Sequence, residues 1–446
     1  MSLKHPASWR SEYAGWRETA PGEWKRPLDS IEKFFYSASS PPPSSGIGHM
    51  MVSAGIRVPL DVDCSFEEVT TVWKSLRYHH PGIACTAEAG SLCYKVPNAE
   101  ELGSWTAETI ITDNSGQTGQ EALARLKSSP IGILIVLPPT REIVFQVPHY
   151  HIDGIGAIKF LDLVLDAFRD PPKQVEFGDE HQNLPQSLPE IINNGAPSLN
   201  SIMRAHRISQ EFLRGFPTID LGKREPTGSE PAVRMERIMF STEETSRICK
   251  EVREHGFTVT HMCHSAMVRV IQSYSRAGFS RYTSFFMINL REQLPACPTT
   301  TDSPVNLRLT ALPGSIAADS NQGFWDLARS LRKTYTQLNK SPEQTDLHKP
   351  MYDFLGTTPV ALEYRKAVHL SSIGIVEKHF AHTVDDFWIG VSSATSEVTV
   401  YVWTFKDRLT FTVWYNEAYH RQSDMKKFLQ LMRDKLLSGL WLDRTW

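Results

Sequence analysis

The residues most able to do chemistry lie in one short stretch, PHYHIDG at residues 148–154. It contains a His-x-x-x-Asp-Gly pattern that runs from His149 to Asp153 and Gly154. An imidazole with its ordinary pKa of about 6.5 is largely neutral at cytosolic pH, so it can take a proton from a hydroxyl or an amine. We therefore predict that His149 is a general base, that Asp153 holds the geometry without reacting, and that Gly154 allows a sharp turn.

Other interpretations of this stretch stay open from the residues alone. His149 and His151 are also compatible with polar side chains that are satisfied by backbone groups at a strand end. His151 is the competing base, because it stands only two residues before Asp153. A metal site needs a third ligand at suitable spacing, and the neighbouring sequence offers none. The sequence also lacks a phosphate-binding glycine loop, a hydrolase nucleophile elbow and a dinucleotide fingerprint, which disfavours kinases, α/β-hydrolases and dehydrogenases.

The motif is predicted to lie between a strand and a helix. Residues 131–137 and 142–147 are apolar and β-branched, and PPT at 138–140 between them suits a hairpin turn. Residues 154–168 repeat apolar side chains at helical period. The predicted order is strand, motif, helix, and active groups favour such connecting turns.

Strand and helix patterns alternate through the rest of the chain, which predicts a mixed α/β fold. We expect a first strand at 34–36, a Pro- and Ser-rich loop at 37–46, and a helix at 65–79 behind a capping box, Ser65-x-x-Glu68. Residues 170–197 lack a periodic apolar face, so we expect a connection between domains there. The other expected strands cover residues 92–96, 106–112, 233–240, 283–290, 304–312, 368–376, 397–404 and 408–415, and the other expected helices cover 120–126, 241–256, 260–275, 321–339 and 422–437.

The composition is that of a large globular chain. Its 446 residues exceed the roughly 250–300 that one core serves, so two domains are expected. Lys and Arg number 47 against 50 Asp and Glu, a net charge of −3 that disfavours nucleic acid as a partner. The first residues lack the apolar run of a signal peptide, and no segment approaches the ~20 apolar residues of a membrane span. We expect a cytoplasmic monomer with no membrane partner, whose six cysteines are reduced.

Further motifs follow in the order and spacing of a known family. They are GFTVTHMCHSAMVRV at 256–270, FFMINLR at 285–291, SPVNLRL at 303–309, HLSSIG at 369–374 and DDFWIG at 385–390. With PHYHIDG, they make most of the chain resemble the CoA-dependent acyltransferase superfamily, which includes chloramphenicol acetyltransferase, plant BAHD acyltransferases and peptide-synthetase condensation domains. SSIGIVEKHF at 371–380, DDFWIGV at 385–391 and VWTFKDRLTFTVWYNE at 402–417 give a narrower likeness to fungal trichothecene 15-O-acetyltransferase and related acetyltransferases of secondary metabolism.

The resemblance implies an α/β fold, an α+β sandwich of two chloramphenicol-acetyltransferase-like domains at 1–195 and 196–446, with an active-site tunnel between them. It places His149 in the middle of that tunnel. It implies that Asp153 points away and forms a structural ion pair with Arg291.

The resemblance also suggests further residues that line the active site. They are Ser371, Ser372, Asp386 and Trp388. The two serines are also compatible with ordinary strand residues, an interpretation that we favour, and Asp386 is an alternative partner for Arg291.

Two features depart from the subfamilies. The plant motif is Asp-Phe-Gly-Trp-Gly, whereas residues 386–390 here are DFWIG, with the Trp displaced. Condensation domains usually carry two adjacent histidines, whereas Pro148 precedes His149 here, and we expect no attached adenylation or carrier module. Both the plant subclass and a modular peptide synthetase are therefore disfavoured.

The expected activity is O-acyl transfer to a hydroxyl of a secondary metabolite. The partners would be this small-molecule acceptor and acyl-CoA, used as a co-substrate with no resident cofactor and no metal. Alternatives are a stand-alone condensation enzyme that takes a thioester from an acyl carrier protein, or a catalytically silent binding relative. Cys249 and Cys263 are conceivable acyl carriers, but both lie in apolar helical stretches where structural thiols are expected.

Overall fold

The structure, a computed structural model, describes residues 15–38, 50–59, 65–171, 174–192, 197–222, 233–275, 280–294, 303–319, 321–339, 344–356, 367–392 and 395–441. The chain divides into two compact units. The first combines Met1–Pro197 with Leu290–Leu309 and Lys378–Ser392, and the second combines Ser198–Asn289, Thr310–Glu377 and Ser393–Trp446. The division into domains at 1–195 and 196–446 stays a prediction.

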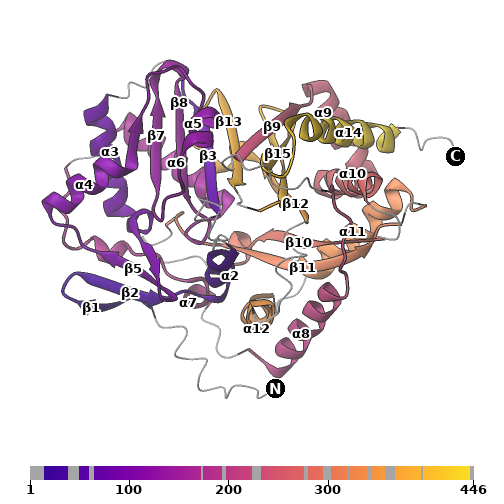
Figure 1. The fold of residues 1–446 in the computed structure, drawn as a ribbon, viewed down its shortest axis with the longest axis horizontal. Helices are drawn as coiled ribbons and strands as arrows, with labels where there is room; N and C mark the ends of the chain where they lie inside the picture. The colour runs from indigo at the N-terminus through magenta and orange to yellow at the C-terminus, as the bar shows by residue number, and fades with distance from the viewer. Residues whose placement is uncertain are drawn as a thin grey trace. The chain divides into compact units, whose positions relative to one another are not determined.

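The first unit is built on a five-stranded sheet (Figure 1). In sheet order its strands are β13 (Asp386–Ser392), β3 (Met51–Arg57), β8 (Glu142–Pro148), β7 (Ile133–Leu137) and β6 (Ile110–Thr112). Neighbours pair antiparallel, except that β6 runs parallel to β7. Strand β8, which leads into the motif, is buried along its whole length. A strand fixed on both sides in this way holds the residues that follow it in a defined place.

Helices pack against this sheet and form the core of the first unit. They are α3 (Phe66–His79), α4 (Ala99–Thr109), α5 (Gly119–Arg125) and α6 (Gly154–Arg169), while the short helix α7 (Leu188–Ile192) follows later in the chain. Helix α6 contacts β3 and α3, and the rings of Trp73, Phe145 and Phe160 meet in this core. A smaller sheet has the order β1 (Arg17–Ala20), β2 (Glu23–Pro27), β5 (Ser91–Lys95) and β4 (Thr86–Glu88).

The second unit has a four-stranded sheet with its own covering helices. The sheet order is β12 (Val368–Ile375), β14 (Val398–Phe405), β15 (Arg408–Asn416) and β9 (Val233–Met239), and β10 (Arg281–Asn289) pairs separately with β11 (Leu309–Ala317). The helices are α8 (Leu199–Leu213), α9 (Thr242–Glu254), α10 (Val259–Tyr274), α11 (Phe324–Asn339), α12 (Gln344–Gly356) and α14 (Gln422–Trp441). Side chains from α10, α11, α14 and the sheet share one apolar cluster. The predicted mixed α/β class is confirmed.

Three predicted strands are wrong in place or type. Residues 34–36 belong to helix α2 (Ser30–Ala38), because the Asp29 carboxylate accepts from the backbone N–H groups of Ile31 and Glu32 and so caps a helix. Residues 106–109 are helical, since Asn98 and Glu101 form a capping box that begins α4 upstream. The strand expected at 304–312 begins only at Leu309. Most of the loop expected at 37–46 lies outside the described residues.

None of the helices in the described part of the chain is long and apolar enough to cross a membrane.

Candidate active site

The motif is held at the junction of β8 and α6, in the first unit. The backbone N–H of His149 donates to the carbonyl of Met50, 2.8 Å away, which extends the pairing of β8 with β3 by one residue. The N–H of His151 then donates to the carbonyl of Pro148 at 3.0 Å and closes a turn. Helix α6 begins directly afterwards, at Gly154. The structure thus has the predicted order of strand, motif and helix.

One of the two ring nitrogens of His149 is hydrogen-bonded within the protein. Its Nδ1 lies 3.0 Å from the carbonyl oxygen of Ile152. Because a carbonyl oxygen can only accept, Nδ1 must carry the proton, and in the neutral ring the lone pair then resides on Nε2. Within the described residues, Nε2 makes no hydrogen bond. This tautomer is the one that a base acting through Nε2 requires.

The surroundings of His149 favour the neutral form of its ring. The side chain is 8% exposed, and the ring of Phe35, on helix α2, stacks on it at a centroid distance of 3.9 Å and an interplanar angle of 15°. Burial lowers the pKa of His149 below its ordinary value, and the backbone hydrogen bonds and the Asp153 charge offset only part of this effect. His149 is therefore unprotonated at neutral pH, as a base must be.

Asp153 is the N-cap of α6 and braces the motif. One of its carboxylate oxygens accepts from the backbone N–H of Gly156 at 2.8 Å, and the other accepts from the backbone N–H of Arg308 at 2.7 Å. The Nη1 of Arg291 lies 3.0 Å from both oxygens. Burial alone would raise the pKa of Asp153, but the Arg291 charge and these hydrogen bonds lower it overall. The carboxylate stays ionised, and both of its oxygens are hydrogen-bonded. These properties suit a residue that supports the motif rather than one that transfers a proton.

The segment that carries Arg291 and Arg308 lies directly against the start of α6. A Cβ added at Gly156 would come within 2.3 Å of the carbonyl oxygen of Pro304, so this position admits no side chain. Neither Gly156 nor the backbone of Arg308 was expected from the sequence. The glycine was visible in GIG at 154–156, but a backbone donor leaves no sequence signal.

The structure brings Asp153 and Arg291 together, as an ion pair whose side chains are 2% and 16% exposed. His151 is buried in the same turn, with its ring 4.3 Å from that of Tyr150. That His149, and not His151, is the base stays a prediction.

The remaining predicted lining residues lie on other strands. Trp388 is buried on β13, where its indole fills the space above Gly55, so that a Cβ there would approach it to 2.3 Å. Asp386 begins the same strand, opposite Arg57. Ser371 and Ser372 lie on β12 in the second unit, where the hydroxyl of Ser372 is 2.8 Å from that of Thr260. Their part in an active site stays a prediction.

The cysteines and the possible metal ligands among the described residues complete the list of predicted chemical groups. Burial raises the pKa of both Cys263 and Cys249, which disfavours their thiolates. No group of three or more His, Cys, Asp or Glu side chains in the described ranges is arranged to hold a metal ion.

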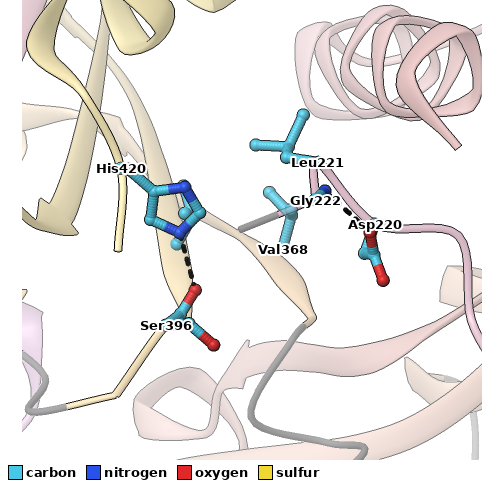
Figure 2. Close-up of a pocket in the computed structure, with 7 residues that line it drawn as sticks. Asp220, Leu221, Gly222, Val368, Ser396 and His420 are labelled. Atoms are coloured by element: carbon cyan, nitrogen blue, oxygen red, sulfur yellow. Dashed lines mark hydrogen bonds between the residues drawn. The ribbon is translucent and has the colours of Figure 1, made fainter. Parts of the chain in front are cut away.

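A pocket in the second unit has none of the predicted site residues in its lining (Figure 2). It is lined by Asp220, Leu221, Gly222, Val368, Ser396, Val398 and His420. Two hydrogen bonds join residues of its lining: the Nε2 of His420 donates to the carbonyl of Ser396 at 2.9 Å, and the N–H of Gly222 donates to Asp220 at 2.7 Å. We assign no function to it.

Comparison with known proteins gives similarity along nearly the whole chain. The sequence is 24% identical to O-acetyltransferase pigM of Monascus ruber, over 93% of this chain and 85% of that protein. It is 25% identical to acetyltransferase pigO of the same organism, over 95% of this chain and 98% of that protein. A third relative, 22% identical over 96% of this chain and 97% of its own, is named loline biosynthesis cluster 1 transcription factor lolU1, from Epichloe uncinata. No protein-family profile matches the chain.

Solved structures share the fold. Trichothecene 15-O-acetyltransferase TRI3 from Fusarium sporotrichioides superposes with a TM-score of 0.76 at 17% identity, covering 98% of this chain and all of that one (100%). The first condensation domain of the CDA synthetase superposes with a TM-score of 0.65 at 12% identity, covering 93% and 96% of the two chains. The chain therefore has the fold that this trichothecene acetyltransferase shares with the condensation domain.

Proposed function

We propose that this protein is an O-acyltransferase that moves an acetyl group from acetyl-CoA to a hydroxyl of a fungal secondary metabolite. The observation that carries the proposal is the state of His149, a buried neutral imidazole whose proton is fixed on Nδ1 and whose Nε2 is available. The names of the relatives, two of them acetyltransferases, support the choice of acyl group.

In the proposed reaction His149 acts as base and then as acid. Its Nε2 removes the proton of the acceptor hydroxyl while the hydroxyl oxygen attacks the thioester carbonyl carbon. The carbon–sulfur bond then breaks, and the CoA thiolate leaves with the proton from Nε2. No acyl-enzyme forms, and a positioned base of this kind contributes ~10²–10⁴-fold to the rate.

Asp153 and Arg291 have a supporting role in this proposal. The Ile152 carbonyl that fixes the His149 tautomer belongs to the residue directly before Asp153. The N-cap bond and the ion pair of Asp153 hold that turn in place. The carboxylate therefore acts on the base through the backbone rather than by contact with substrate.

The test is mass spectrometry of products after the purified protein is incubated with acetyl-CoA and a panel of hydroxylated polyketides and terpenoids. We expect an acceptor that gains the mass of one acetyl group with wild type and not with His149→Gln. A parallel reaction with an acetylated carrier protein distinguishes the donors. If the acetyl group is transferred only from the carrier protein, the donor is a carrier thioester and not acetyl-CoA. If neither donor gives transfer to any acceptor, the result favours a catalytically silent binding relative.

A further inference from the structure

Helix α2 places three consecutive aromatic residues beside the motif. Phe35 stacks on His149 at 3.9 Å, and Tyr36 meets Tyr150 edge-on at 5.4 Å and an interplanar angle of 80°. Phe34 in turn lies edge-on to Phe35 at 5.4 Å. The side chain of Phe35 is 2% exposed, so its ring has a fixed place in the core of the first unit.

The position of α2 is fixed at its first turn by a buried ionic network. Arg26 donates to both carboxylate oxygens of Glu32, at 2.6 and 2.7 Å, and all of these groups are buried. The Glu32 carboxylate also accepts from the backbone N–H of Asp29 at 2.8 Å, while Asp29 caps the helix. A bidentate Arg–carboxylate pair is among the most restrictive side-chain contacts. The helix therefore presents Phe35 to the motif with little freedom.

The two contacts of the His149 ring both restrict its rotation about the Cβ–Cγ bond. The hydrogen bond from Nδ1 to the Ile152 carbonyl limits this rotation, but the direction of a hydrogen bond at a carbonyl oxygen varies broadly, so some rotation remains. A flat ring stacked at an interplanar angle of 15° restricts this remaining rotation and covers one face of the imidazole. Together they fix the direction in which the Nε2 lone pair points.

We propose that Phe35 is a positioning residue for the base, because its ring holds the imidazole plane of His149 so that Nε2 faces the acceptor hydroxyl. The effect of Phe35 on kcat that this inference predicts rests on the proposed function. Misplacement of a reacting group by about 1 Å can cost 10²-fold in rate, so a looser ring should be visible in kcat. The same stack keeps water from one face of His149 and contributes to the burial that lowers its pKa.

The test compares Phe35→Leu with a matched control on the same helix, Tyr36→Leu. Leucine keeps an apolar side chain at position 35 but removes the flat surface, so we expect kcat to fall roughly tenfold with a smaller change in KM. Tyr36→Leu removes an aromatic side chain that contacts Tyr150 and not the base, and should leave kcat near that of wild type. Thermal midpoints of both variants show whether either change acts only through stability.

A second measurement needs no substrate. The titration of His149 is followed by NMR in ¹⁵N-histidine-labelled wild type and Phe35→Ala, with His149→Gln to assign the signal. Removing the ring admits water, so the pKa of His149 should rise toward its ordinary value. The proposal is overturned if this titration is unchanged and Phe35→Leu lowers kcat no more than Tyr36→Leu does. If wild type transfers no acetyl group, the proposed function fails, while the titration still decides whether Phe35 controls the ring.

Discussion

Two buried histidines, His149 in the first unit and His264 in the second, differ in how their ring nitrogens are used. In His264, on helix α10, Nδ1 lies 3.0 Å from the Tyr335 hydroxyl and Nε2 lies 3.0 Å from the Tyr282 hydroxyl. The Tyr282 hydroxyl donates its proton to the carbonyl of Val368 at 2.9 Å, so its oxygen must accept from Nε2–H. Nδ1 is then the acceptor for Tyr335, and both nitrogens are occupied.

His369 repeats this arrangement in the second unit. Its Nδ1 lies 2.8 Å from the Ser284 hydroxyl and its Nε2 lies 3.2 Å from Glu397. The sequence of groups is that of a Ser–His–acid triad, but Ser284 is completely buried (0% exposed). A buried hydroxyl offers no access for a substrate, so we interpret these contacts as a link between β10, β12 and the start of β14.

Burial alone does not distinguish the proposed base from a structural histidine. Burial lowers the pKa of His149 and, with the charges of His261 and His369, lowers that of His264 to about 3. Both rings are neutral at pH 7, but of these two rings only that of His149 retains a nitrogen with no hydrogen bond within the described residues. The number of occupied ring nitrogens, rather than the pKa, distinguishes the proposed base from a structural histidine.

The largest effect is expected for His149→Gln, which keeps a polar side chain of similar length but removes the base. The rate of acetyl transfer should fall ~10²–10⁴-fold, with little change in the thermal midpoint. Initial rates and calorimetry on the same preparation measure both quantities. Turnover close to wild type would remove the distinction between the two histidines.

The next effect concerns the support of the motif. Asp153→Ala leaves Arg291 without its carboxylate and removes the helix cap, so the free energy of unfolding should fall by ~3–5 kcal/mol, and activity should fall with it. Urea titrations of Asp153→Ala, Arg291→Leu and the double variant measure the coupling. The double variant should lose less than the sum of the single losses, and strict additivity would contradict an energetic ion pair.

His264→Leu should show the opposite pattern to His149→Gln. The hydroxyls of Tyr282 and Tyr335 lose a partner, and an unsatisfied buried polar group costs ~1–3 kcal/mol, so the thermal midpoint should fall. The rate per folded molecule should stay at the wild-type value. A folded but inactive His264→Leu would show that the second unit takes a direct part in the chemistry.

Among the histidines of the motif, the smaller change in rate is expected for His151→Ala. His151 is buried beside Tyr150 in the turn, so its loss should lower stability somewhat, while kcat/KM should fall less than tenfold, or ~1.4 kcal/mol. Initial rates at saturating acetyl-CoA measure this. If His151→Ala were inactive and His149→Gln active, the base would be assigned to the wrong residue.

The sequence was most informative where local pattern determines structure. The apolar strand before His149 and the amphipathic helix after Gly154 were predictable, because each has its own periodicity. Residues 34–36 were misread as a strand, since three adjacent aromatics resemble one and the signal for a helix was the Asp29 cap. Phe35 lies 114 positions before His149 in the chain, and no local pattern shows a contact between such distant residues.

The most direct test of the account is the protonation state of His149 in the free protein, which requires no knowledge of the acceptor. Isotope-edited NMR of ¹⁵N-histidine-labelled protein, with His149→Gln for assignment, reports which ring nitrogen carries the proton. It also reports the pH at which the other ring nitrogen binds a proton. We predict a neutral ring at pH 7 with the proton on Nδ1, and a pKa below the ordinary value of about 6.5 because the ring is buried. Activity should then persist as the pH falls below 6.5 and decline only near this lower pKa. A proton on Nε2, or a ring that is already charged at pH 7, would contradict the assignment of His149 as the base.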